Sequence, residues 1–403
     1  MTTATDSPRR GGRVPWLDGV RAIAALYVVL HHTWLMVWPA FPVNNGPAWT
    51  GVLVYGQFAV ALFIVVSGYS LTLRPASHAG ELLGGSAGFF RGRARRILPP
   101  YWAALAISTL LLFALRQFDP TVVYSTKSVV VHALLLQDLV QHSVINGTFW
   151  SIAVECQIYI LFPLVLLLLR RRGATAVVVA AAVLVVAGHA AASAVPVLHK
   201  FDDLTPQFFV LFVLGVVAAR RPGDELPPRR RRWLGRIAAS SVVALVLGRL
   251  LIGPVRFADH FFWADMLVGI AVAAWLAMLG DGALPRVRRA LASRPLALVG
   301  AASYSIYLIH APILRMFWFL AVRPADLSPV WSFLVLLLVG VPATLVACAA
   351  FFLVCERPFL RPRAALAGAV EPAREQASSE ATGVATAAAP RLAEELSGSE
   401  AQR

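Results

Sequence analysis

The chain has 403 residues, of which 58% are hydrophobic and only 14% are charged. Soluble domains carry about a quarter charged residues, so this composition and the mean hydropathy of +0.70 exclude an ordinary soluble protein and indicate an integral membrane protein. The net charge of +15 does not point to nucleic acid as a partner, because the basic residues recur as short clusters between apolar runs and no nucleic-acid motif is present.

Apolar runs of about 20 residues, the length that crosses a bilayer, recur along the chain. We therefore predict an all-α polytopic integral membrane protein with about ten transmembrane helices. The expected spans are 20–38, 50–71, 99–115, 149–169, 174–195, 205–219, 237–252, 261–279, 296–320 and 329–354. The apolar run 128–140 is too short to span, which favours an interfacial or re-entrant helix.

The positions of Lys and Arg predict that both termini are cytoplasmic. With the N-terminus inside, 25 basic residues fall in inner segments and 5 in outer ones, as the positive-inside rule requires. The N-terminal residues are too polar for a cleaved signal peptide, so the first span is expected to anchor the chain in the cell membrane. We expect a cytoplasmic segment over 1–15, a transmembrane domain over 16–362 and a disordered cytoplasmic tail over 363–403, which lacks apolar periodicity.

The first span, "RAIAALYVVLHH" at its centre, carries ionisable residues that are costly in a membrane. Arg21 and His32 are eleven residues apart, which places them within about 20° of one helix face and about 16 Å apart along the axis. His31 points about 100° away from His32, and His310 in a later span lies at a similar depth. Arg21 alone is open to a second interpretation, snorkelling to the inner interface, and His31 is interpreted as a packing residue. Ionisable residues inside a membrane are otherwise a functional signal.

A carboxylate also lies in the membrane. Glu155 is about six residues from the outer end of its span, and Ser151 and Tyr159, four residues away on either side, share its face. An unpaired carboxylate there has to be protonated or paired. The alternative to a functional role is that Glu155 packs against Arg249 or Arg315 of another helix.

Arginines gather at the expected cytoplasmic side. The run "FFRGRARRILPPYW" carries four of them, Arg93 and Arg96 included, just before a predicted helix start at Pro99. Arginines beside a helix N-terminus suit a phosphate group, and Ser67 and Gly68 are expected at the end of the second span on the same side. A topology signal alone accounts for one or two of these arginines more easily than for four.

Five segments, taken together and in order, resemble the acyltransferase-3 family of integral membrane acyltransferases. They are "LDGVRAIAALYVVLHH", "ALFIVVSGYSL", "RGRARRILPPYW", "FWSIAVECQIYILFP" and "ASYSIYLIHAP". The resemblance covers roughly Trp16 to Pro362. It implies transfer of an acyl group, commonly acetyl from acetyl-CoA, to a hydroxyl of a carbohydrate, a cell-envelope glycan, a lipid or a macrolide-type natural product.

The resemblance also implies roles for particular residues. The arginine and histidine of the family's first helix fall on Arg21 and His32, and its Arg-x-x-Arg falls on Arg93 and Arg96. Its Trp-Ser…Glu segment falls on Trp150, Ser151 and Glu155. Many members carry an acidic or bulky residue after that Glu, where this chain has Cys156, so only Glu155 is given a role.

We hypothesise that acyl-CoA enters from the cytoplasm, with Arg21, Arg93, Arg96, Ser67 and Gly68 binding this donor. Neutral His32 then acts as a general base on a hydroxyl, since an imidazole pKa near about 6.5 suits that task, or else forms a covalent acyl-histidine. Glu155, the second expected catalytic residue, either orients the imidazole of His32 or stabilises its charged form. The residues expected to bind the acceptor or to support the site are Asp18, Trp150, Ser151, Tyr304, Tyr307 and His310. No bound cofactor or metal is expected, because the three cysteines lack paired spacing.

Two other classes of protein remain as alternatives. A transporter or flippase of a glycan or lipid-linked precursor also uses intramembrane His and Glu, as proton relays. Such proteins often show internal repeats and paired broken helices, and neither signal stands out in the sequence. A purely structural membrane scaffold does not account for the buried charges.

Overall fold

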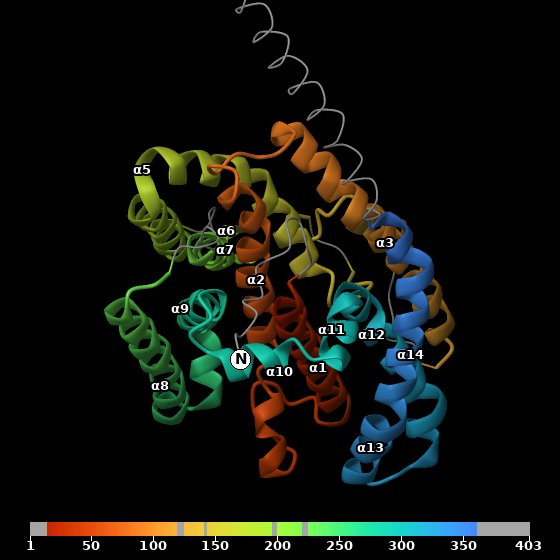
Figure 1. Cartoon of the computed structure of the whole chain (residues 1–403). Helices are drawn as coiled ribbons and strands as arrows, with labels where there is room; N and C mark the ends of the chain where they lie inside the picture. The colour runs from red at the N-terminus through yellow and green to blue at the C-terminus, as the bar shows by residue number, and fades with distance from the viewer. Residues whose placement is uncertain (1–13, 119–124, 141–142, 196–199, 220–224, 361–403) are drawn as a thin grey trace, which may run out of the picture. The chain divides into compact units, whose positions relative to one another are not determined.

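The structure, a computed structural model, describes residues 14–118, 125–140, 143–195, 200–219 and 225–360. Every regular element within these residues is a helix, which confirms the predicted all-α fold class (Figure 1). The α-helices are α1 (Pro15–Val37), α2 (Gln57–Ala76), α3 (Gly85–Leu115), α4 (Thr126–Ala133), α5 (Trp150–Ala194), α6 (Lys200–Asp203), α7 (Gln207–Ala218), α8 (Pro228–Asp259), α9 (Phe261–Gly280), α10 (Pro285–Leu291), α11 (Arg294–Ala301), α12 (Ser303–Phe317), α13 (Pro329–Val335) and α14 (Val341–Phe351). Short π-helical turns, Trp318–Val322, Leu336–Gly340 and Phe352–Glu356, follow α12, α13 and α14, and a 3₁₀ turn, Ala48–Leu53, precedes α2.

The helices reproduce the expected membrane spans. Within the described residues, eight helical stretches are long and apolar enough to cross a membrane. Two further expected spans are accounted for by α5, whose 45 residues are interrupted at Gly173 with φ at 79°, and by the shorter α7. The chain is therefore a multi-pass membrane protein. The predicted interfacial segment 128–140 overlaps α4, which has only 8 residues.

The start of the third span differs from the prediction. We expect a helix start at Pro99, but α3 begins at Gly85 and holds Pro99 and Pro100 in its interior. The two prolines deprive the carbonyls of Arg95 and Arg96 of their helical N–H partners. These two residues are exposed, so water can satisfy their carbonyls. The predicted helix N-terminus beside the arginines is therefore wrong, and any anion site there depends on side chains.

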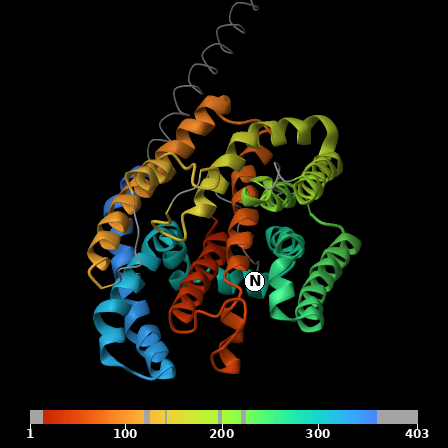
Figure 2. The same ribbon diagram turned by 180° about the vertical axis from the view of Figure 1, so that it is seen from behind.

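The first helix lies at the centre of the helical assembly. Figures 1 and 2 show α1 and α2 in the middle, α8 at one edge and α13 with α14 at the other. The expected span 296–320 is broken at Ala302, and the separate helix α11 packs against α1. A Cβ at Gly300 would lie 1.9 Å from the carbonyl oxygen of Asp18, so only glycine permits this close approach.

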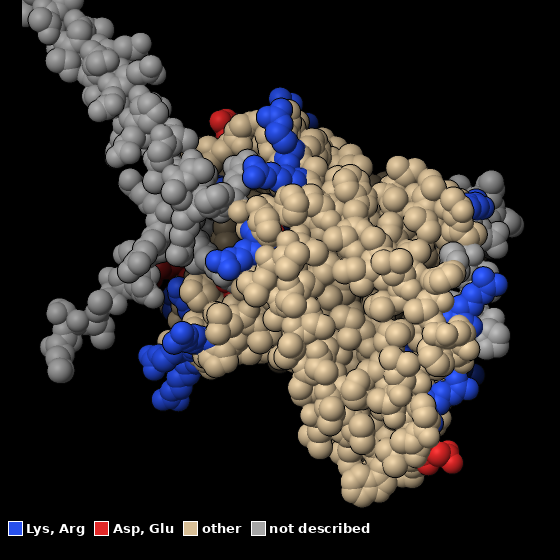
Figure 3. All heavy atoms as spheres, turned by 90° about the vertical axis from the view of Figure 1, so that its right-hand side faces the viewer, with Lys and Arg blue, Asp and Glu red and all other residues tan. Residues whose placement is uncertain are grey.

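The surface fits a bilayer. Figure 3 shows Lys and Arg side chains at opposite edges of the molecule with a broad uncharged surface between them. Large apolar side chains are exposed, such as Leu250 at 70% and Leu251 at 80% on α8. The predicted disordered tail 363–403 lies outside the described residues, as does the predicted segment 1–15 apart from Val14 and Pro15.

Candidate active site

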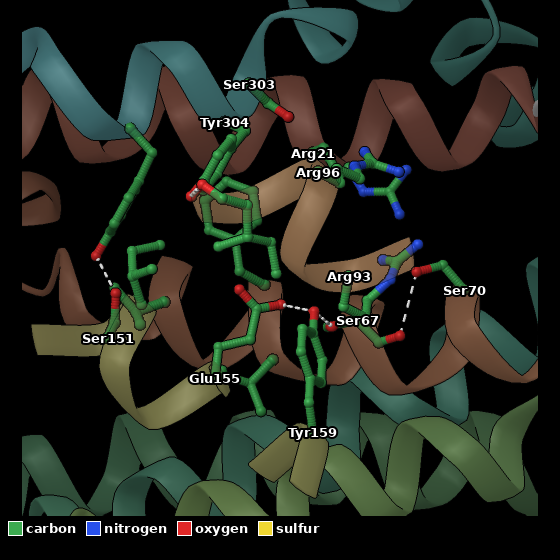
Figure 4. A pocket seen from close by; sticks show the side chains of 16 residues that line it. Arg21, Ser67, Ser70, Arg93, Arg96, Ser151, Glu155, Tyr159, Ser303 and Tyr304 are labelled. Carbon is green, nitrogen blue, oxygen red and sulfur yellow. Dashed lines mark hydrogen bonds between the residues drawn. The ribbon is translucent and has the colours of Figure 1, made fainter. Parts of the chain in front are cut away.

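Eight of the predicted site residues line one cavity of about 130 Å³, which we call the arginine cavity. It lies among α1, α2, α3, α5 and α12, so segments far apart in the sequence meet there. Its polar lining consists of Arg21, Ser67, Ser70, Arg93, Arg96, Ser151, Glu155, Tyr159, Ser303, Tyr304 and Tyr307. Figure 4 shows the three arginines gathered at one end and Ser151 at the other.

The three guanidinium groups make the first end of the arginine cavity strongly cationic. Asp18 Oδ1 accepts a hydrogen bond from Arg21 Nη1 at 3.2 Å, so Arg21 is paired with a carboxylate. Arg93 Nε is buried and has no hydrogen-bond partner within the described part of the chain. Arg96 is exposed at the rim. A buried donor without a partner costs free energy, and an anionic oxygen would remove this cost at Arg93.

Glu155 belongs to a short hydrogen-bonded chain on the floor of the arginine cavity. Tyr159 donates its hydroxyl hydrogen to Glu155 Oε1, and Ser67 Oγ lies 2.7 Å from the Tyr159 oxygen (Figure 4). Because the Tyr159 hydrogen goes to Glu155, Ser67 is the donor in the second bond. This chain ties α2 to α5 and holds the carboxylate beside the arginines. Arg249, one of the packing partners considered for Glu155, donates to the hydroxyl of Tyr55 instead.

The far end of the arginine cavity is closed by a tyrosine–serine pair. The hydroxyl groups of Ser151 and Tyr307 lie 2.6 Å apart. The rings of Phe63 and Tyr307 pack edge to face. Tyr304 donates its hydroxyl hydrogen to the carbonyl of Ile97 at 3.1 Å, which joins α12 to α3. These aromatic side chains fix the end of the cavity that faces the second half of α12.

A second cavity of about 290 Å³, the histidine cavity, lies along the other halves of three of the same helices. Its lining is His32, Leu35, Met36, Ser108, Leu112, Leu115, Ile145, Asn146, Gly147, Ala311, Pro312 and Arg315. Helices α1, α3 and α12 contribute side chains to both cavities, each from opposite halves. The helical rise separates Arg21 from His32 by about 16 Å, so the two cavities occupy different depths.

His32 is held by a second histidine. His310 Nε2 lies 3.0 Å from His32 Nδ1, and Val28 O lies 3.0 Å from that same nitrogen. His310 is fully buried, and its Nδ1 faces the carbonyl oxygens of Ile306 at 2.8 Å and Tyr307 at 3.0 Å. The structure thus places His310 at the position beside His32 that was expected for Glu155.

Comparison with known proteins decides the family. Residues 14–353 match the family whose description is acyltransferase domain. The chain belongs to the acyltransferase-3 family. It is also 26% identical over 333 residues to acyltransferase MdmB of Streptomyces mycarofaciens, which covers 76% of this chain and 81% of that relative. No solved structure matches. The protein is therefore an acyltransferase of the membrane.

Besides His310, three residues predicted for this acyltransferase site line neither cavity. Gly68 is inside α2 rather than at its end, and a Cβ there would lie 2.1 Å from the carbonyl oxygen of Phe212 on α7. Its lack of a side chain serves helix packing, so the structure does not support its predicted donor contact. Trp150 stacks on Phe208 with ring centroids 5.8 Å apart and joins α5 to α7. Asp18 reaches the site only through Arg21.

His31 also packs outside the two cavities of the acyltransferase. Its Nδ1 lies 2.7 Å from the carbonyl oxygen of Leu53, and its ring stacks on that of Trp34. It therefore serves to hold the 3₁₀ turn Ala48–Leu53 against α1. This placement makes His31 a control for substitutions at its neighbour.

Sequence reasoning missed a buried asparagine that builds the wall of the histidine cavity. Asn146 Nδ2 donates to Ser108 Oγ at 3.2 Å and to Leu308 O at 2.9 Å, while its Oδ1 accepts from the Thr148 backbone N–H and hydroxyl. All the polar atoms of this amide are satisfied, so it joins the loop to α3 and α12. The Asn-Gly-Thr turn signal was available in the sequence, but its distant partners were not.

No metal centre is evident in the part of the chain that the structure describes. No group of three or more His, Cys, Asp or Glu side chains there is placed to hold a metal ion. The described residues offer an imidazole at His32 and a cluster of three guanidinium groups, of which that of Arg21 lies about 16 Å from His32 along α1.

Proposed function

We propose that this membrane acyltransferase moves an acyl group, acetyl being the expected one, from acyl-CoA to a hydroxyl of a carbohydrate, an envelope glycan or a glycosylated natural product. One observation carries the proposal: three guanidinium groups line one cavity, and a histidine lines a second cavity on the same helices. An anionic donor needs the first arrangement, and activation of a hydroxyl needs the second.

The arginine cavity fits the phosphate-bearing part of acyl-CoA. Arg93 offers a buried unpartnered Nε, and Arg21 and Arg96 line the same cavity. A cavity of about 130 Å³ is smaller than the roughly 300–1,000 Å³ of typical ligand pockets, so it accommodates only part of such a donor. The rest extends past the exposed Arg96 to the surface, which the excess of arginines at this end predicts to be cytoplasmic.

The histidine cavity supplies the acceptor side of the reaction. His32 Nε2 takes the proton of the acceptor hydroxyl while the hydroxyl oxygen forms a bond to the thioester carbonyl carbon. The carbon–sulfur bond then breaks, and the departing CoA thiolate takes the proton from His32. The ester product and CoA–SH leave, and His32 returns to its neutral form.

The thioester has to pass between the two cavities. No residue lines both of them, and the Ser151–Tyr307 pair lies at the end of the arginine cavity nearest His310. Because the Tyr307 ring also lies against the ring of His310, with centroids 6.2 Å apart, movement of the Tyr307 side chain is coupled to the site of His32. We infer that the pantetheine arm displaces this pair on its way to His32.

A radiolabel assay tests the proposal. The purified full chain in detergent is incubated with [1-¹⁴C]acetyl-CoA and a cell extract containing glycans and secreted metabolites, and label in the CoA-free product is counted. Acyl transfer predicts labelled product without a membrane gradient. A transporter or flippase predicts no labelled product in detergent and movement of a glycan or lipid precursor only in sealed vesicles.

A further inference from the structure

We propose that His310 is a positioning residue that keeps the proton of neutral His32 on Nδ1 and so leaves His32 Nε2 free as the base. The inference deepens the proposed acyl transfer and rests on it for its catalytic meaning. The tautomer itself, however, is a property of the two histidines that is measurable whether or not acyl transfer occurs.

The first step fixes the protonation of His310. Its Nδ1 faces only carbonyl oxygens, those of Ile306 at 2.8 Å and Tyr307 at 3.0 Å. Carbonyl oxygens accept and never donate, so His310 Nδ1 carries a hydrogen. The side chain is fully buried, and no carboxylate among the described residues forms an ion pair with it. A charged imidazole without such a partner is costly in this position, so His310 is neutral and its Nε2 is an acceptor.

The second step transfers this constraint to His32. The acceptor nitrogen of His310 lies 3.0 Å from His32 Nδ1, and the carbonyl of Val28 also lies 3.0 Å from it. Both neighbours of this nitrogen accept, so it is the one that carries hydrogen. In a neutral imidazole the other nitrogen then has a free lone pair. His32 Nε2 makes no hydrogen bond within the described residues, and His32 lines the histidine cavity.

The two partners of His32 Nδ1 have different roles. Val28 is four residues earlier on α1, so its carbonyl orients the His32 ring only relative to α1 itself. His310 is on α12, and its bond to His32 fixes the ring relative to the wall of the histidine cavity. When His32 gains a proton at Nε2, the imidazolium keeps its Nδ1–H bond to a neutral acceptor, and hydrogen bonds from charged donors are stronger. The contact therefore favours the protonated state that forms during transfer.

Two substitutions of similar size separate positioning from packing. His310→Gln keeps an oxygen that can accept from His32, whereas His310→Met fills the space with only a weak acceptor. Loss of the partner that orients a metal-bound histidine typically reduces activity about 10-fold to 100-fold, and we expect a similar factor for a partner that orients a histidine base. We expect His310→Met to lower kcat by that factor with the acceptor KM unchanged, and His310→Gln to recover most of kcat. A raised acceptor KM at unchanged kcat in His310→Met would show acceptor binding instead and would overturn the proposal.

The direct readout is ¹⁵N NMR of the full chain labelled at histidine nitrogens, in detergent. The ring signals of His32 are assigned by their absence in His32→Gln. The proposal predicts the Nδ1–H tautomer for His32 in the unsubstituted protein, and the Nε2–H tautomer there would overturn it, even if His310→Met fails to fold. A fixed Nδ1–H tautomer without acyl transfer to any acceptor would refute the proposed function and leave the positioning intact.

Discussion

Removal of the buried guanidinium of Arg93 should weaken donor binding more than removal of any other arginine on α3. Arg93 lines the arginine cavity, and its buried Nε has no partner within the described residues. A hydrogen bond to a charged group contributes about 1.5–3 kcal/mol. Since 1.4 kcal/mol corresponds to a factor of ten, Arg93→Met should raise the Kd for acetyl-CoA about 10-fold to 150-fold.

The chain offers a graded set of controls on the same helix. Arg96 lines the arginine cavity but is exposed, so solvent screens its charge and Arg96→Met should raise Kd by less, up to about fivefold. Arg91 is exposed and lines neither described cavity, so Arg91→Met should leave Kd within about twofold. Isothermal titration calorimetry with acetyl-CoA in nanodiscs measures all three, after size-exclusion chromatography confirms a single folded species. Equal Kd values for the Arg93 and Arg91 variants would refute the assignment of the arginine cavity to the donor.

Three further changes test other parts of the account. Gly68→Ala should destabilise the protein by about 1–3 kcal/mol because its Cβ meets the α7 backbone. At Gly235 the nearest atom to an added Cβ is Met278 Sδ at 4.0 Å, an ordinary contact, so Gly235→Ala should not destabilise. Thermal unfolding of both variants in detergent decides, and equal stability would contradict the packing of Gly68 on α7. Burial raises the pKa of Asp138 to about 7, above its value in the unfolded chain. The folded state therefore binds a proton that the unfolded state has lost, and the free energy of unfolding should fall as pH rises from about 4 to 7. Asp138→Asn should flatten this dependence of stability on pH, and an unchanged dependence would contradict the raised pKa. Leu112→Trp should fill the histidine cavity and raise the KM for the acceptor at least about fivefold. Leu110 is exposed on the lipid-facing side, so Leu110→Trp should leave this KM unchanged. Equal KM values for the two variants would place the acceptor elsewhere.

The membrane spans were predictable because hydropathy and length alone decide them. The ends of the helices were not predictable wherever tertiary packing or solvent overrides the local sequence preference. Proline is a common first residue of a helix, yet α3 starts at Gly85 and holds Pro99 and Pro100 in its interior. The break at Ala302 separates α11 from α12. Helix α11 packs on α1, and no local sequence pattern predicts that contact.

The candidate site was predictable in its members and less so in its pairs. Helical spacing placed Arg21 and His32 at two depths, and the structure finds them in two cavities. The partner of His32 depends on how α5 and α12 are rotated about their axes, which a single sequence does not encode locally. Glu155 consequently faces Tyr159, and His310, 278 residues from His32, takes the expected place of Glu155.

The central claim is that His32 is the base of an acyl transfer, and comparison of two adjacent histidines tests it most directly. The measurement is the rate of label transfer from [1-¹⁴C]acetyl-CoA in detergent for His32→Ala and His31→Ala. General-base catalysis is worth about 10²-fold to 10⁴-fold, so His32→Ala should lose at least about 100-fold. His31→Ala, which loses the bond to the Leu53 carbonyl and the ring contacts with Trp34 and His32, removes no group that lines either cavity and should keep most of the activity. Near-equal rates for the two variants, or a His32→Ala rate close to that of the unsubstituted protein, would contradict the account.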